Sequence, residues 1–341
     1  MSSNNYFVIT PYYKGTALEE IVNSVIVAAR HVSAKIRIIG FLEPLDNKLH
    51  TEFLDDEKYP VMQARLNEML LRVRSPKRML FLDFFNPGLD LLRYTHKQKG
   101  ILCKYGALLH GGTFLEHDLY NFDWLENFEL AWAYVYDKIY APAYFIAEKF
   151  PKNLRNKVVV KSWGMDSFRP ASGHNRRYEV IFPHRLNKDK GIDDLYKIAR
   201  RLPKINFYVT APQKMNYLKS NDYFKKLSAR GNVHILANQT DEMHHKTLAQ
   251  SKIVLSCARQ EIFGFSIMKS VLSGCIPVLP NRQIYPYYFS TDFLYNTIDE
   301  ACQLIKRYLR DATLPFERLK AVRNRIKNLS FINILKDFYL K

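Results

Sequence analysis

Short apolar runs alternate with helix-length amphipathic segments, and this alternation constrains the fold more than any other feature of the sequence. Residues 18–32 have apolar side chains at helical spacing between the first two runs. Regular alternation of this kind is typical of α/β proteins built on parallel sheets. The runs with strand character in the first half are 6–10, 35–42, 78–85, 104–110, 138–140 and 158–163.

The same alternation restarts after a polar, linker-like stretch at residues 170–177. We expect strands at 178–182, 205–210, 233–236, 253–257 and 276–279. Helices are expected at 192–202, 240–250 and 265–273, followed by basic helices from 314 to 341. These patterns predict two Rossmann-like domains, residues 1–170 and 171–341, with the last helix packing back on the first domain.

The charge is distributed unevenly along the chain. With 51 Lys and Arg against 33 Asp and Glu, the formal net charge is +18. Residues 1–150 hold 17 basic and 18 acidic side chains, whereas residues 151–341 hold 34 and 15. An excess of this size favours a polyanionic partner, either a nucleic acid or an anionic membrane surface.

Two classes of protein are not expected. No apolar stretch reaches the ~18 residues of a membrane-spanning helix, so we expect no stable membrane insertion. Residues 1–5 lack the basic region of a signal peptide. The cysteines lack C-x-x-C spacing, which favours free thiols in a reducing cytoplasm over a zinc site. They are Cys103, Cys257, Cys275 and Cys302.

The first motif of the second half is Phe-Pro-His-Arg-Leu-Asn-Lys-Asp-Lys-Gly at 182–191, where a strand ends and a helix begins. Ligands of open α/β sheets bind beyond the carboxyl ends of the strands. Arg185 offers a bidentate fork for phosphate oxygens, and Lys190 offers a compact charge. A solvated basic turn is the alternative.

The second motif spans residues 256–266, where Glu261 follows a strand and Gly264 opens a helix. Glycine lets a ligand approach the backbone, and the amides of Gly264, Phe265 and Ser266 can cradle a diphosphate. Glu261 can accept hydrogen bonds from sugar hydroxyls. A plain helix start is the alternative. Residues 273–278, Ser-Gly-Cys-Ile-Pro-Val, end this helix and begin a strand.

In this order and spacing, the three motifs resemble the glycogen-synthase-like retaining glycosyltransferases of the GT-B fold, in which two Rossmann-like domains face each other across a cleft. The resemblance implies a nucleotide-sugar donor, such as a UDP- or GDP-sugar, as substrate and no other cofactor. It adds Phe263 to the donor-binding residues. Details at 183–190, 256–264, 274–275 and 285–286 are closest to the branch that mannosylates queuosine in tRNA.

One position departs from the family pattern. The second glutamate, which in the family holds the nucleotide ribose, would stand at position 269, where this chain has lysine. A lysine donates hydrogen bonds and accepts none. Either another residue holds the ribose, or the donor nucleotide differs, or Lys269 contacts phosphate.

The first half contributes further candidates. Gly15 lies in a strand-to-helix turn, where it either faces the donor or serves the turn alone. His110 ends an apolar strand and is followed by two glycines, so we expect it in the active site. His117 and Asp118 are loop residues that can line the acceptor side, although a plain loop is the simpler interpretation. A basic cluster that can contact acceptor phosphates comprises Arg72, Arg74, Lys77 and Arg78.

The sequence has no D-x-D triplet, the signature of a metal-bound donor site in the other glycosyltransferase fold. We therefore expect a metal-independent transfer with retention of configuration. Arg185 and Lys190 would neutralise the leaving diphosphate. Glu261 would hold the sugar, and His110 would form the opposite wall.

For the acceptor, we expect a hydroxyl on a modified base. The charge, the 22 Tyr and 22 Phe and the tRNA-branch resemblance favour nucleic acid. DNA carrying hydroxymethylpyrimidines, as in phage DNA, is preferred over tRNA because dense charge suits a uniform duplex. The alternatives are a membrane-associated transferase of lipopolysaccharide or lipid-linked sugars, and a non-catalytic module that binds nucleic acid.

Overall fold

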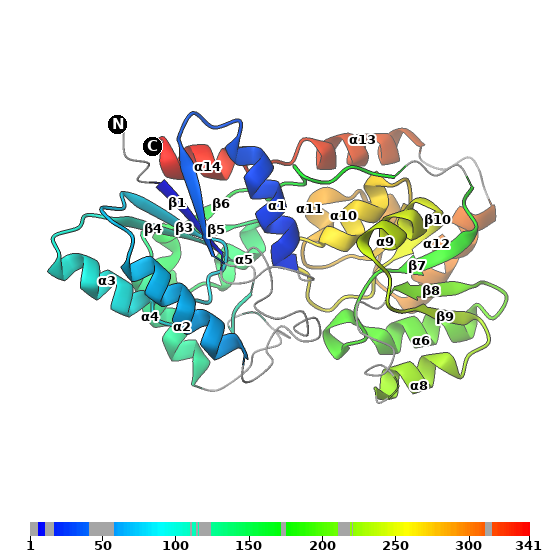
Figure 1. The fold of residues 1–341 in the computed structure, drawn as a ribbon. Helices are drawn as coiled ribbons and strands as arrows, with labels where there is room; N and C mark the ends of the chain where they lie inside the picture. Colours follow the sequence, from blue (N-terminus) through cyan, green and yellow to red (C-terminus); the bar gives the residue numbers. More distant parts are fainter. Residues whose placement is uncertain are drawn as a thin grey trace. The chain divides into compact units, whose positions relative to one another are not determined.

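In the computed structural model the chain forms two compact α/β units (Figure 1). Unit 1 comprises Met1–Ser167 and Leu329–Lys341, and unit 2 comprises Phe168–Asn328. The residues that the structure describes are 6–10, 17–40, 58–109, 111–113, 115, 124–171, 175–210, 219, 221–310 and 316–341.

Unit 1 is built on a parallel sheet of six strands in the order β2-β1-β3-β4-β5-β6. The order changes direction between β1 and β3, because β1 pairs with β2 on one side and with β3 on the other. The strands are β1 (Tyr6–Thr10), β2 (Ile36–Gly40), β3 (Arg78–Phe81), β4 (Lys104–Leu108), β5 (Lys138–Ala141) and β6 (Val158–Val160).

Helices cover both faces of this sheet. Helix α1 packs against α14, the last helix of the chain, and α3 packs between α2 and α4. Right-handed crossovers place α2, α3 and α4 together on the face opposite α1. The helices are α1 (Ala17–Ala29), α2 (Lys58–Leu71), α3 (Leu89–Gln98), α4 (Leu125–Val135), α5 (Tyr144–Lys149) and α14 (Ile332–Tyr339), with a 3₁₀ helix at Lys152–Lys157.

The sheet of unit 2 also has six parallel strands, in the order β12-β11-β10-β7-β8-β9. From its other edge this is the 3-2-1-4-5-6 order of dinucleotide-binding folds, with the switch point between β7 and β10. The strands are β7 (Tyr178–Phe182), β8 (Phe207–Thr210), β9 (Val233–Leu236), β10 (Ser251–Leu255), β11 (Ile276–Pro280) and β12 (Leu294–Tyr295).

The helices of unit 2 follow these strands in turn. Thr240 caps α9, since its hydroxyl accepts from the Met243 amide at 3.2 Å. The helices are α6 (Ile192–Arg201), α8 (Asp222–Ser228), α9 (Asp241–Ala249), α10 (Phe265–Leu272), α11 (Tyr285–Tyr288), α12 (Ile298–Arg310) and α13 (Phe316–Lys327), with short 3₁₀ turns at Lys188–Lys190 and Thr291–Phe293.

The structure confirms the predicted α/β class with two parallel sheets. Three strands have the predicted bounds, 6–10, 178–182 and 233–236. The strand predicted at 78–85 ends at Phe81, and β10 begins and ends two residues earlier than predicted. Strand β12 was not predicted, because two residues are too few to show a pattern.

All four cysteines are buried free thiols. Among the helices of the described residues, none has both the length and the apolar character that crossing a membrane would require.

Helix α14 belongs to unit 1 although it ends the chain. The Asp337 carboxylate accepts from Lys138 Nζ at 3.0 Å and from the Tyr140 hydroxyl at 2.9 Å. The Phe338 ring lies so close to Gly106 that a Cβ there would stand 2.7 Å from it. The Arg78 guanidinium donates to the Phe338 carbonyl. The helix therefore fills a position in the core of unit 1 that the first 167 residues leave to it.

We predict that Phe338→Ala destabilises unit 1 by about 3–5 kcal/mol, because a buried ring leaves a cavity against Gly106. Leu340→Ala, two residues on and at a position that is half exposed, should change the free energy of unfolding by no more than about 0.5 kcal/mol. Urea denaturation of both variants measures this. If both variants lose the same small free energy of unfolding, α14 is not part of the core.

Candidate functional site

Two loops of unit 2 meet beyond the carboxyl ends of neighbouring parallel strands. One follows β7 and begins with Pro183 and His184, and the other follows β10 and runs from Ser256 to Glu261. The two strands pair directly, with Ile181 opposite Val254. Because β7 and β10 flank the switch point of the sheet, the crevice at their ends is where a ligand of this fold binds.

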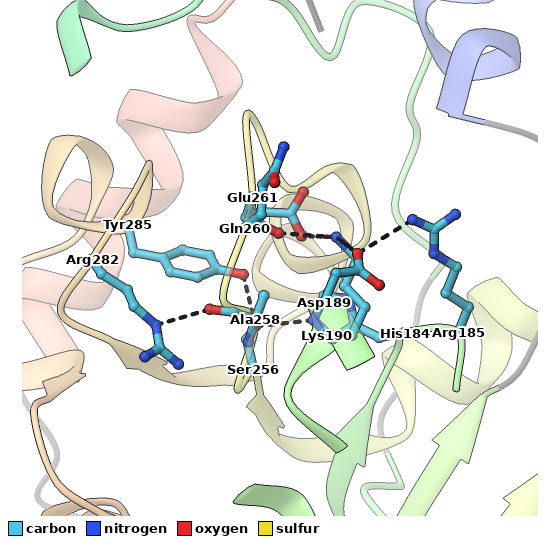
Figure 2. Close-up of polar contacts among 10 residues, drawn as sticks. All are labelled: His184, Arg185, Asp189, Lys190, Ser256, Ala258, Gln260, Glu261, Arg282 and Tyr285. Carbon is cyan, nitrogen blue, oxygen red and sulfur yellow. Dashed lines mark hydrogen bonds and ion pairs between the residues drawn. The ribbon is translucent and has the colours of Figure 1, made fainter. Parts of the chain in front are cut away.

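Four charged side chains from these loops form one ion cluster (Figure 2). The Asp189 carboxylate lies 3.3 Å from Arg185 and 3.4 Å from Lys190. Lys190 Nζ also lies 3.4 Å from the Glu261 carboxylate and donates to the Gln260 carbonyl at 3.1 Å. The cluster therefore joins the β7 loop to the β10 loop by charge.

The ion cluster is largely shielded from water. The side chains of Asp189, Lys190 and Glu261 are 9%, 15% and 15% exposed, whereas that of Arg185 is 33% exposed. Within the described residues, Arg185 Nε and Asp189 Oδ1 are buried without a hydrogen-bond partner. Buried polar atoms normally have partners, so these two have unused capacity for hydrogen bonding.

A chain of uncharged hydrogen bonds lies beside the cluster (Figure 2). His184 Nε2 lies 3.0 Å from the Ser256 hydroxyl, which lies 2.7 Å from the Tyr285 hydroxyl. Burial, with Lys190 and Arg185 nearby, lowers the pKa of His184 well below its usual value. Burial and the Glu261 charge raise the pKa of Tyr285 well above its usual range. Both side chains are therefore uncharged at neutral pH.

The two loops also touch through their backbones. The Arg259 amide donates to the Asp189 carbonyl at 2.8 Å. From the loop after β11, the Arg282 side chain donates to the Ala258 carbonyl at 3.0 Å. Gly191, at φ +70°, faces the Cys257 carbonyl, which would lie 2.1 Å from a Cβ at this position. Glycine is therefore required there by both conformation and space.

Helix α10 begins at the edge of the same site. Its N-cap, Gly264, has φ +80° and provides no side-chain cap. Glu261 packs against this glycine, since its Cγ would lie 3.3 Å from a Cβ at Gly264. The ring centres of Phe263 and Phe265 lie 4.7 Å apart, and Ser266 is half-buried. The first N–H groups of a helix have no acceptor within it and suit an anion.

Lys269 lies on α10 and is buried. Its ammonium stands 5.6 Å from the centre of the Phe168 ring. Burial, followed by the charge of Lys269, lowers the pKa of His244 to about 4. The lysine that replaces the family's glutamate therefore faces an aromatic ring and an uncharged histidine.

The candidates predicted in the first half are spread over unit 1 or fall outside the described residues. Gly15, His110, His117 and Asp118 lie outside the described residues. Arg72 forms an ion pair with Glu68, and Arg74 and Lys77 are exposed. Arg78 donates to the Phe338 carbonyl, so its guanidinium links β3 to α14.

The loop that follows β4 is held by hydrogen bonds to a buried carboxylate of α4. Glu129 of α4 is buried and accepts from the Thr113 amide at 2.8 Å and from the Thr113 hydroxyl at 2.5 Å. This contact fixes the chain three residues after His110.

Sequence reasoning missed four residues of the site, His184, Asp189, Ser256 and Tyr285. The signal was present for His184 and Ser256, because a polar side chain closely following a buried strand lies at the carboxyl edge of the sheet. No such signal marks Tyr285, which reaches Ser256 from α11.

Comparison with known proteins gives one family match. Residues 165–325 match the model described as Glycosyl transferases group 1. Over 137 residues the chain is 27% identical to the tRNA-queuosine alpha-mannosyltransferase of Drosophila melanogaster. The match covers 38% of this chain and 36% of that protein, so it spans about a third of the relative's length.

Solved structures match over nearly the whole chain. The catalytic domain of starch synthase IV from Arabidopsis thaliana, bound to ADP and acarbose, has a TM-score of 0.71 at 13% identity, covering 99% of each chain. Alr3699/HepE of Anabaena, in complex with UDP and glucose, has a TM-score of 0.67 at 10% identity, covering 97% of each. These likenesses show the fold, and they confirm the predicted GT-B resemblance.

We predict that His184 makes stability depend on pH. Its folded-state pKa lies below that of the unfolded chain, so the unfolded state binds an extra proton once the pH falls below about 6.5. Between pH 7 and pH 5 the wild type should therefore lose about 2 kcal/mol that His184→Gln does not lose. Urea denaturation at both pH values measures the difference, and identical losses would contradict a buried, uncharged His184.

Proposed function

We propose that the chain is a glycosyltransferase that takes its sugar from a nucleotide-sugar donor, because residues 165–325 match the model described as Glycosyl transferases group 1. The ion cluster at the switch point of sheet β7–β12 carries this proposal. It brings two cations and the start of α10 to the edge where this fold binds phosphates. Two relatives in fold have nucleoside diphosphates bound, which agrees with such a donor.

In this proposal the donor diphosphate exchanges partners with the carboxylates of the ion cluster. Arg185 and Lys190 would give up part of their ion pairing with Asp189 and Glu261 and would pair with the diphosphate oxygens instead. The backbone amides of Gly264, Phe265 and Ser266 would donate hydrogen bonds to the same diphosphate. Glu261, released from part of its pairing with Lys190, could then accept hydrogen bonds from the sugar hydroxyls.

The transfer itself would proceed with retention and without a metal. The bond between the anomeric carbon and the diphosphate oxygen breaks, and a bond from the acceptor oxygen forms on the same face. The acceptor's proton passes to the departing diphosphate oxygen. Arg185 and Lys190 stabilise the negative charge that develops on that oxygen.

For the acceptor we propose a hydroxyl on a modified base in nucleic acid, and specifically in tRNA. The sequence alone preferred hydroxymethylated DNA. The matched relative is a tRNA-queuosine mannosyltransferase, and this likeness moves the proposal to tRNA. The net charge of +18 supports either polyanion.

A second candidate function is transfer to lipopolysaccharide sugars. The structure of WaaG, a glycosyltransferase involved in lipopolysaccharide biosynthesis, has a TM-score of 0.66 at 12% identity and covers 98% of this chain. A non-catalytic, nucleic-acid-binding role is the third, and nucleotide-sugar turnover would exclude it.

We predict that Arg185→Ala lowers the turnover of nucleotide sugar by about 10²–10³-fold, because one charge stabilising the leaving group is lost. Lys188→Ala is the matched control, since this exposed lysine lies three residues on and outside the ion cluster. Hydrolysis of radiolabelled donor gives both rates. Wild-type turnover by a folded Arg185→Ala variant would remove the proposed donor site.

We also predict that labelled sugar is transferred to tRNA in preference to other acceptors. Purified protein is supplied with labelled UDP-, GDP- and ADP-sugars and with tRNA, hydroxymethylcytosine DNA or lipopolysaccharide. Label in tRNA alone is the expected result. Label in DNA would restore the preference drawn from the sequence, and label in lipopolysaccharide would establish the second candidate function instead.

A further inference from the structure

Exposed apolar side chains gather on unit 1. Of the eleven large hydrophobic side chains that are exposed within the described residues, nine belong to this unit. Seven of them lie on or directly beside α2, α3 and α4, which form one layer over the sheet (Figure 1). These seven are Met69, Leu91, Tyr94, Leu102, Trp124, Phe128 and Tyr134. Exposed apolar side chains gathered in this way mark an interaction surface.

Four of these side chains form an aromatic zone toward the carboxyl edge of the sheet. Leu91 and Tyr94 stand in the first two turns of α3, and Trp124 and Phe128 stand at the start of α4. Because each helix follows a parallel strand, its first turn lies near that strand's carboxyl end. Tyr94, Trp124 and Phe128 are 62%, 58% and 54% exposed, and the Trp124 and Phe128 rings pack edge to face at 5.6 Å.

The opposite end of the same layer is basic. This basic zone lies near the amino ends of β3 and β4, because β3 begins at Arg78 and β4 begins at Lys104. Its exposed members, which come from the end of α2, the end of α3 and the start of β4, are Arg72, Arg74, Lys77, Lys97, Lys99 and Lys104. Arg72 pairs with Glu68. A positive surface is therefore present on unit 1 although residues 1–150 carry no net positive charge.

The two zones adjoin on α3, because Tyr94 and Lys97 lie three residues, or about 4.5 Å, apart along the helix axis. One strand can therefore reach both zones at once. Exposed aromatic rings stack on bases whose faces are free, and lysines and arginines neutralise phosphates.

We propose that the α2–α3–α4 layer is the docking surface for the acceptor RNA, with unpaired bases on the aromatic zone and backbone phosphates on the basic zone. The proposal rests on the proposed function and adds the form of the acceptor to it. Base stacking on Trp124 and Phe128 requires unpaired nucleotides, so the acceptor is a stem-loop and not a uniform duplex.

Binding measured by fluorescence anisotropy tests the docking surface. The full chain is titrated with a tRNA and with a fully paired RNA duplex. The double variant Trp124→Ala/Phe128→Ala should bind tRNA about tenfold or more weakly, while its affinity for the duplex stays unchanged. Lys97→Glu/Lys99→Glu should weaken binding of both RNAs and lower the slope of log affinity against log salt by about 2.

Matched controls come from unit 2. Met243→Ala removes an exposed apolar side chain, and Lys204→Glu reverses an exposed charge. Both should bind tRNA as the wild type does. All substituted positions are exposed, and circular dichroism verifies that each variant is folded.

The outcomes separate the docking surface from the activity. If the aromatic variant binds tRNA as tightly as the wild type, the docking surface is wrong, and transfer of sugar to tRNA by the wild type would still support the proposed function. If RNA binds through this surface but no nucleotide sugar is turned over, the surface stands and the proposed function falls. Vesicles of phosphatidylserine and phosphatidylcholine are the third probe. Binding to them and not to RNA, lost in the aromatic variant, would overturn the proposal in favour of a membrane.

Discussion

The pairing of Asp189 with Arg185 and Lys190 is the interaction on which the rest of the site depends. It holds two cations, 3.3 Å and 3.4 Å from one shielded carboxylate, at the point where the strand order of the second sheet changes direction. Lys190 then reaches Glu261 on the other loop. Without the carboxylates, two like charges confined in a poorly hydrated crevice would repel each other. With them, the four side chains of the ion cluster balance in formal charge, and in the proposed function a diphosphate takes the place of a carboxylate.

The uncharged chain from His184 through Ser256 to Tyr285 complements this charge balance. A protonated histidine beside Arg185 and Lys190 would add a third positive charge, and burial prevents it. The two loops therefore keep their spacing through neutral hydrogen bonds, while the ion cluster remains free to change partners.

Much of the architecture could be predicted from the sequence because strand and helix signals are local. Three strands have their predicted bounds, and the position of Gly264 at the start of α10 followed from its place after a buried strand. The role of Arg78 could not be predicted, because its partner, the Phe338 carbonyl, lies 260 residues away. Asp189 was missed for a related reason. As one acidic residue in a basic loop it has no pattern of its own, and only the fold brings Glu261 to the neighbouring lysine.

The central claim is that the switch point of the β7–β12 sheet binds the diphosphate of a nucleotide. Calorimetric titration of the full chain with UDP, GDP and ADP, and with the matching nucleosides, tests this most directly. At least one diphosphate should bind, its affinity should fall as salt is raised, and its nucleoside should bind far more weakly. Equal binding of nucleoside and diphosphate, or no binding of any diphosphate, would contradict this claim.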